Sequence, residues 1–212
     1  IKQDFIKLGK YSIRSGNISH VQVSMDKYLE DYEFLYDLSF VDSNIEICFI
    51  ERPFLLGLYI SSHNCSGKYG IYPTQNRFAF EVKYNGDVLD EKKELGMCKR
   101  VIYYINSKYD IKLALKDLKE EVYYYIEDNN MLEEENLKTV DLKDLPTNIT
   151  LIDLYNKSSV SLDESVKFLF LYQIIENISM FVIKKQGCIS FRKLLEEYDK
   201  IGQIYLLKFW NI

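Results

Sequence analysis

Residues 166–183 constrain the fold of this chain more than any other stretch, because apolar side chains occupy nearly every side of the helix that they predict. The preceding Ser161-Leu162-Asp163-Glu164 is a capping-box pattern, in which a serine hydroxyl and a glutamate carboxylate satisfy free amides at a helix start. Lys184-Lys185 suits the negative end of the helix dipole, and Gly187 then predicts the end of the helix. A helix that is apolar all round is typical of the middle of a helical core, so we expect residues 162–185 to be buried among other helices.

A change of hydrophobic period near Asn85 separates two kinds of structure. Before it, two-residue alternation and short apolar runs predict strands, and after it a spacing of three and four residues predicts helices. The predicted strands cover residues 18–25, 45–50, 54–60 and 77–84, while residues 27–40 fit either period. Besides 162–185, the predicted helices cover residues 89–107 and 110–126 and a last segment that begins at Ser190. This segregation predicts an α+β fold, with an N-terminal antiparallel β-sheet region over residues 1–86 and a C-terminal helical bundle over residues 87–212.

The charge balance argues against a general nucleic-acid-coating role. The chain of 212 residues carries 27 Lys and Arg against 32 Asp and Glu, and the Lys residues are interleaved with the acidic ones. Non-specific binding to nucleic acid depends on clustered basic side chains that displace counterions from phosphates. The charge therefore gives no support to nucleic acid as a partner, although a small local basic patch would still permit contact.

Tyrosine is unusually frequent, at 18 residues. The side chain combines a large apolar body with a polar tip, which suits half-buried and interface positions. The codon usage of an AT-rich genome would explain the same excess. If the excess is functional, it favours a protein partner or self-association.

Cysteine usage and the lack of a recognisable targeting signal predict a cytoplasmic protein. Cys48, Cys65, Cys98 and Cys188 are far apart and form no C-x-x-C or zinc-ligand spacing, so we expect reduced thiols. The sequence shows no signal peptide, and its longest apolar run is far too short to span a bilayer, so we expect no membrane contact. The chain begins at Ile1 rather than Met and ends within an apolar pattern, which is typical of a fragment of a longer protein.

Two histidines, His20 and His63, are available for chemistry that needs an imidazole. His63 lies two residues before Cys65 in a polar stretch, which fits either an ordinary loop or a thiol activated by a neighbouring base. His20 fits a half-exposed position in a strand. The sequence holds no complete catalytic motif, so the catalytic residues stay unassigned, and we expect no cofactor and no metal.

Glu81 and Lys83 match the E-x-K element of the restriction-nuclease-like fold. In such a site an acidic residue and a lysine on one strand face help to hold a divalent metal ion and position water. A further upstream acid is required, for which Asp42 or Glu46 could serve. The alternative is charge pairing between neighbouring strands, which explains both residues without a metal.

The segment Leu154–Glu176 carries the family resemblance of this chain. Leu154-Tyr155-Asn156-Lys157, then Ser161–Glu164, then Lys167–Glu176 resemble the first core helix of HEPN-like all-α domains in bacterial defence and abortive-infection proteins. Several such proteins join a strand-rich N-terminal region to this helical domain. The resemblance implies RNA cleavage during phage-triggered growth arrest.

The ribonucleases of that family use an Arg followed, after four to six residues, by a His. Neither Arg100 nor Arg192 has a His at those positions. The resemblance therefore implies an inactive, structural version of the domain, or a catalytic motif beyond Ile212. In the predicted helix, Gln173 and Glu176 would form a polar stripe that meets a neighbouring helix or a partner chain.

Together these features favour a non-catalytic or partner-dependent component of a bacterial anti-phage defence system that acts through protein–protein contacts. A nuclease is one alternative, either metal-dependent through Glu81 and Lys83 or HEPN-type with catalytic residues outside this chain. The other alternative is an acidic immunity or inhibitor protein that masks a basic toxin.

Overall fold

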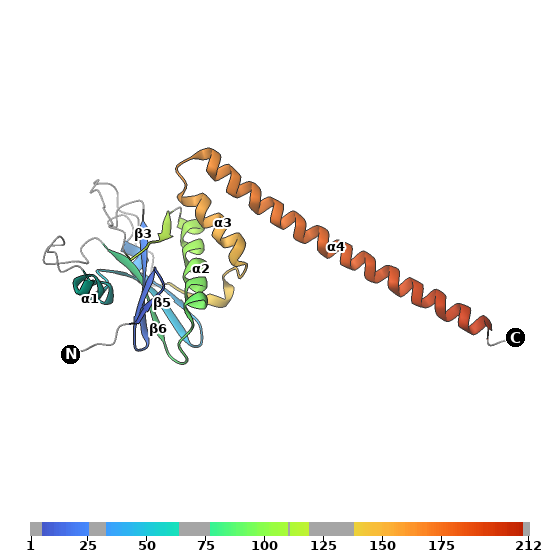
Figure 1. Cartoon of the computed structure of the whole chain (residues 1–212), viewed down its shortest axis with the longest axis horizontal. Helices are drawn as coiled ribbons and strands as arrows, with labels where there is room; N and C mark the ends of the chain where they lie inside the picture. Colours follow the sequence, from blue (N-terminus) through green and yellow to red (C-terminus); the bar gives the residue numbers. More distant parts are fainter. Residues whose placement is uncertain (1–5, 26–32, 64–76, 110, 119–137, 210–212) are drawn as a thin grey trace.

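The computed structural model describes residues 6–25, 33–63, 77–109, 111–118 and 138–209, with side chains over residues 9–25, 34–62, 77–109, 111–118 and 138–186. Within these ranges, a sheet with helices on both faces is joined to one long helix that leaves the sheet domain (Figure 1). The strands are β1 (Ile6–Leu8), β2 (Ser12–Ser15), β3 (Ile18–Met25), β4 (Leu38–Val41), β5 (Ile45–Glu51), β6 (Phe78–Tyr84), β7 (Leu113–Leu115) and β8 (Lys138–Asp141). The helices are α1 (Phe54–His63), α2 (Glu91–Tyr109), α3 (Ile149–Val160) and α4 (Glu164–Phe209), with 3-10 turns η2 (Glu33–Asp37) and η3 (Leu142–Asp144).

The sheet runs in the order β1-β2-β3-β6-β5-β4-β8, and β7 pairs with the C-terminal end of β3. Neighbouring strands are antiparallel except β4 and β8, which run parallel. At the centre of the sheet Phe80 stands between Val21 of β3 and Phe49 of β5. Aromatic and β-branched side chains pack well on such a pleated surface, which is why these segments form the central strands.

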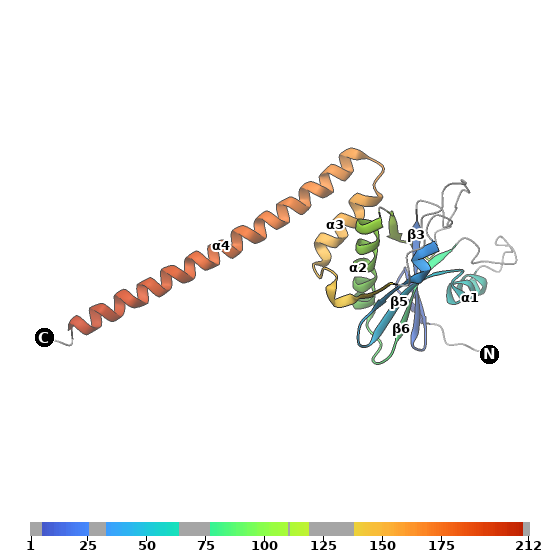
Figure 2. The ribbon, with the colours of Figure 1, turned by 180° about the vertical axis from the view of Figure 1, so that it is seen from behind.

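The two faces of the sheet are covered differently. One face carries the main hydrophobic core, in which alternate residues of β3, β5 and β6 meet buried residues of α2 such as Val101 and Ile105. The opposite face is partly covered by α1, where Leu56 packs with Ile13 and Ala79. Figures 1 and 2 show α1 on one side of the sheet and α2 with α3 on the other.

Polar and aromatic contacts fix α3 against α2. The Lys99 ammonium lies 2.8 Å from the Asp153 carboxylate, and the rings of Tyr103 and Tyr155 meet edge to face with centroids 4.9 Å apart. The Asn156 side-chain amide donates a 3.1 Å hydrogen bond to the Lys99 carbonyl. The end of α3, from which α4 departs, is thereby tied to the sheet domain.

The long helix α4 contains 46 residues and extends away from the sheet domain (Figures 1 and 2). Its first turn is capped by Asp163, whose carboxylate accepts hydrogen bonds from the amides of Ser165 at 2.8 Å and Val166 at 3.3 Å. The predicted cap, Ser161, instead donates a 3.2 Å hydrogen bond to the Asp163 carbonyl. The helix therefore starts two residues later than the capping-box pattern predicted.

The α+β organisation predicted from the sequence is confirmed, since most strands lie in the first half and helices close the chain. The strands expected at 18–25, 45–50 and 77–84 form as β3, β5 and β6, and the helix expected at 89–107 forms as α2. Two strands of the sheet, β7 and β8, come from the second half of the chain. The predicted boundary at residue 86 is thus close to the start of α2, but later segments of the chain still add strands to the sheet.

Residues 54–60 were expected to form a strand and instead form the first turns of α1. The prediction was wrong because a short run that is apolar on every side does not distinguish a buried helix from a buried strand. Pro53 precedes the helix, and its carbonyl accepts the first helical hydrogen bond, at 3.1 Å from the Gly57 amide. Pro53 therefore marks a helix start.

Residues 113–115 were expected within a helix and instead form β7. Here tertiary contacts override the helical spacing. The Asn106 side chain donates a 3.0 Å hydrogen bond to the Leu113 carbonyl and accepts a 2.8 Å hydrogen bond from the Leu113 amide, while all three residues of the strand pair with β3. Residues 119–126 of the predicted helix lie outside the described residues.

The predicted helix 162–185 forms as part of α4, but its end and its surroundings differ from expectation. The helix continues through Gly187 and Ser190 to Phe209, so the expected stop and the separate last helix are wrong. A glycine inside a helix costs only about 1 kcal/mol relative to alanine, which a long helix tolerates. The expected burial is also wrong, because every side chain from Val166 to Ile183 is exposed or half-buried.

Candidate functional site

The most unusual surface among the described residues is the first half of α4. Eleven of its large apolar side chains are between 38% and 68% exposed. They are Val166, Phe168, Leu169, Leu171, Tyr172, Ile175, Ile178, Met180, Phe181, Val182 and Ile183. Soluble proteins rarely expose a contiguous apolar surface of this kind unless it binds a protein or a membrane.

The apolar side chains of α4 include a regular line. Phe168, Leu171, Ile175, Ile178 and Val182 are spaced alternately by three and four residues. This is the a and d spacing of a heptad repeat, which keeps side chains on one side of a helix. We call these five residues the seam.

The polar side chains of this segment lie on the other side of the helix. Gln173, Glu176, Asn177 and Lys184 fall about half a turn from the seam, and all four are exposed. We call them the polar face. The stripe predicted for Gln173 and Glu176 forms, but on an exposed helix rather than a buried one, and its contact with a partner chain stays a prediction.

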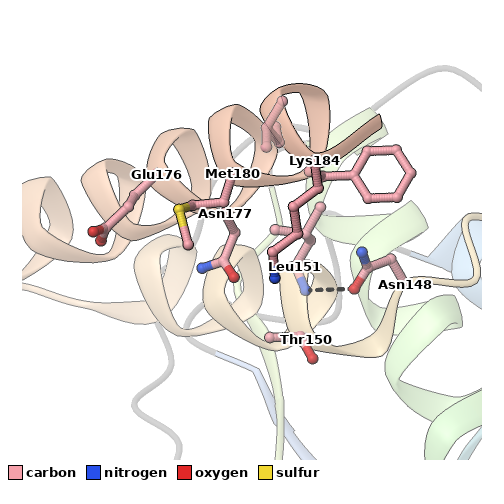
Figure 3. Close-up of a pocket in the computed structure, with 9 residues that line it drawn as sticks. Asn148, Thr150, Leu151, Glu176, Asn177, Met180 and Lys184 are labelled. Atoms are coloured by element: carbon pink, nitrogen blue, oxygen red, sulfur yellow. Dashed lines mark hydrogen bonds between the residues drawn. The ribbon is translucent and has the colours of Figure 1, made fainter. Parts of the chain in front are cut away.

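A groove separates the start of α3 from α4, as Figure 3 shows. It is open to solvent, has a volume of about 630 Å³, and is lined by the α3 cap residue Asn148, by Thr150 and Leu151 of α3, and by Glu176, Asn177, Ile178, Met180, Phe181 and Lys184 of α4. Asn177 and Lys184 extend toward α3 in this view, and Asn148 caps α3 by accepting a hydrogen bond from the Leu151 amide at 3.2 Å. The groove thus takes up part of the polar face, and of the seam residues it reaches Ile178 alone.

Length and composition also qualify part of α4 as a membrane span. Residues Glu164–Gln186 form a 23-residue stretch with a mean hydropathy of 1.5 over its best window, none of which is buried. The stretch qualifies although no uninterrupted apolar run within it is long enough to span a bilayer, and the expectation of no membrane contact stays a prediction. Gln173, Glu176 and Asn177 lie near its middle, where polar and charged groups are costly in lipid.

Glu81 and Lys83 lie on the sheet face opposite the main core, where they form an ion pair of 2.9 Å. The Glu81 carboxylate also lies 3.3 Å from Nε2 of His20 on the neighbouring strand. Burial acts to raise the pKa of Glu81, but the hydrogen bond and charge of Lys83, together with His20, outweigh it and lower the pKa. The hydrogen bond that Lys83 donates to Glu81 raises the pKa of Lys83, so both groups are held in their charged forms.

The acids proposed to complete a metal site are engaged elsewhere. Glu46 stands opposite Lys83 in the register but accepts a 3.0 Å hydrogen bond from Ser39, and Asp42 accepts bonds from the turn residues Ser43 and Asn44. In the part of the chain that the structure describes, no three His, Cys, Asp or Glu residues are grouped to hold a metal ion. The geometry is that of charge pairing on a sheet face.

The remaining nucleophile candidates give no activated thiol among the described side chains. Burial raises the pKa of the Cys48 thiol, so this thiol keeps its proton. His20 was expected to be half-exposed and is instead buried, with Nε2 3.3 Å from the Glu81 carboxylate. The side chains of His63 and Cys65 lie outside the described residues.

Comparisons with known proteins identify no relative. No family model, no curated protein and no solved structure matches this chain. The resemblance of Leu154–Glu176 to a HEPN-like core helix stays a prediction. That segment is divided between the end of α3 and the first 13 residues of α4, with a short connection at 161–163.

The seam was not recognised from the sequence, although its signal is present there. The stretch looked apolar on every side because Leu169, Met180 and Ile183 interrupt the polar face. Counting matches to a heptad, rather than apolar residues alone, would have separated the two sides of the helix.

Proposed function

We propose that this chain acts through protein–protein contact and that the seam of α4 is its docking surface. The sheet domain is then brought to the partner through α4. The observation that supports the proposal is the exposure of the seam, from 40% at Leu171 to 66% at Phe168. Burying large apolar side chains is the main source of free energy in protein association. A helix with an apolar side and a polar side is the form that inserts into grooves or pairs with other helices.

The biological setting that we propose is bacterial anti-phage defence, as a non-catalytic or partner-dependent component. The resemblance of Leu154–Glu176 to HEPN-like core helices is the support for this setting. Such a component would supply the contact that assembles or restrains an effector. A HEPN-type ribonuclease whose catalytic residues lie outside this chain is compatible with the same role for α4. An acidic inhibitor of a basic toxin would also act by contact, and it would use the charged surface of the sheet domain rather than the seam.

The proposal is tested in cells that carry the natural operon of this chain. We expect Ile175→Asp, in the middle of the seam, to abolish protection in a phage plating assay. Gln173→Asp, two residues away on the polar face, is the matched control and should preserve protection. Equal protection by both variants would contradict a role for the seam.

A further inference from the structure

We infer that the occupant of the seam is a second copy of this chain, with the two α4 segments paired antiparallel over residues 164–186. This inference rests on the proposed function of α4 as a docking helix and names its partner. The seam spacing is the first support. Side chains at alternating intervals of three and four residues form a nearly straight line on a helix. Two such lines fit together when each side chain of one helix packs between four side chains of the facing helix.

The distribution of charge selects the orientation. Asp163 and Glu164 lie at the start of the segment together with Lys167, which pairs with Glu164 at 3.7 Å, and Lys184 and Lys185 lie at its end, so the start is net negative and the end net positive. In a parallel pair, acids would meet acids and lysines would meet lysines. In an antiparallel pair each acidic end lies within about one helical turn of the other copy's lysines, and the two helix dipoles are opposed.

A specific register follows from the seam. When Ile175 of one copy faces Ile178 of the other, Leu171 faces Val182 and Phe168 faces the aliphatic stem of Lys185. The ends of the seam are then covered by charged residues of opposite sign. No charge lies between them, because Glu176 is on the polar face.

The exposed area is sufficient for a specific pair. The five seam residues and the adjacent Tyr172 are between 40% and 66% exposed. Burying what they expose on both helices removes on the order of 1,000 Å² from water, which is near the lower limit for a specific interface. The pairing is therefore expected to be reversible and dependent on concentration.

The polar face argues against lipid as the occupant. A helix surrounded by hydrocarbon would expose Gln173, Glu176 and Asn177 to lipid at mid-depth, at a cost of about 2.5 to 3.5 kcal/mol for a charged group alone. In a helix pair all three remain in water or in the groove beside α3.

Analytical ultracentrifugation of the full chain tests the inference. We expect a mass of twice 25.2 kDa at micromolar concentration for the wild-type chain and for Gln173→Asp, and a single-chain mass for Ile175→Asp. The fold of each variant is checked by circular dichroism, since Ile175 is 63% exposed and makes few contacts within its own chain. A wild-type mass of one chain at 100 µM would overturn the inference.

A charge swap tests the orientation. Lys185→Glu should weaken dimerisation about threefold, and adding Glu164→Lys should restore it, because the two positions lie about one helical turn apart across the antiparallel pair. If the double variant is weaker still, the antiparallel arrangement is wrong.

Two further results separate this inference from the proposed function. Flotation of the wild-type chain with phosphatidylcholine vesicles, lost in Ile175→Asp, would overturn both, since lipid would then cover the seam. If the wild-type chain is monomeric and Ile175 is still required for protection in cells, only the inference of a second copy is overturned. The partner of the seam would then be a different protein.

Discussion

The Arg14 guanidinium donates a 2.7 Å hydrogen bond to the buried carboxylate of Glu94, which joins β2 to α2 inside the molecule. Ser19 donates a second bond, at 3.0 Å, to the other oxygen of the same carboxylate, and the Tyr84 hydroxyl donates a further one. Burial, followed by the hydrogen bond to Glu94, raises the pKa of Tyr84, so its hydroxyl keeps its proton. This cluster fixes the helix that carries α3, and through it the start of α4.

Removing the acid of this cluster should destabilise the whole sheet domain. Glu94→Ala leaves the Arg14 charge buried without its partner, and we expect a loss of about 3 to 5 kcal/mol in the free energy of unfolding. Urea denaturation followed by circular dichroism measures it. Lys93→Ala, on the exposed side of the same helix, is the control and should change stability little. A change of under 1 kcal/mol for Glu94→Ala would show that the cluster is not essential.

Asn106 should be the second critical polar residue, because its side chain joins three elements. It satisfies both backbone groups of Leu113 in β7 and donates a 3.1 Å hydrogen bond to Ser159 of α3. Asn106→Ala leaves buried backbone groups without partners, and we expect a loss of about 2 to 3 kcal/mol. Ser107→Ala, at the next and exposed position, should be close to neutral. Equal urea midpoints for the two variants would contradict this account of β7.

Stability should depend on pH through His20. Burial lowers the pKa of His20, although Glu81 partly opposes the effect. Because the unfolded chain binds this proton more readily than the folded one, stability is full above the ordinary imidazole pKa and falls as the pH drops below it. We expect the urea midpoint to decrease from pH 7.5 to pH 5, with a smaller decrease in His20→Gln. If the urea midpoint of His20→Gln decreases as much as that of the wild-type chain, His20 is not the cause of the pH dependence.

The charge pair on the open sheet face should have no catalytic role. Incubation of the chain with RNA and with DNA, with and without Mg²⁺, is expected to give no cleavage that depends on Lys83. Lys83→Ala should leave the products unchanged, since Glu81 and Lys83 neutralise each other in the structure. Cleavage that needs Mg²⁺ and disappears in Lys83→Ala would contradict this expectation and restore the metal-dependent nuclease alternative.

Periodicity predicted the parts of the fold in which one side of an element is buried. β3 and β6 alternate clearly, and α2 repeats apolar residues at helical spacing, because each packs one face on the same core. The same method failed for α1, where Phe54 to Ile60 is apolar on all sides and Leu55 and Leu56 pack with Ile13, Ala79 and Leu118 from distant parts of the chain. It failed for β7 because a side chain 7 residues away, that of Asn106, supplies the deciding hydrogen bonds.

The surroundings of α4 could not be predicted from its composition. An apolar helix is equally consistent with the core of its own domain, a helix of a neighbouring chain or a membrane, and the sequence gives the same side chains in each case. What separates these cases is where the polar residues fall around the helix and whether the rest of the chain covers it. The structure shows that the rest of the chain leaves the seam exposed. The spacing of the seam and of the polar face shows where the polar residues fall around the helix.

Hydrogen–deuterium exchange over α4 tests the central claim most directly. The claim is that residues 168–182 are covered by another molecule and not by their own domain. In the wild-type chain at high concentration we predict slow exchange over these residues, and in Ile175→Asp fast exchange over the same residues with unchanged protection of β3, β6 and α2. Equal protection of 168–182 in both proteins, independent of concentration, would contradict the claim, because the helix would then be buried within its own chain.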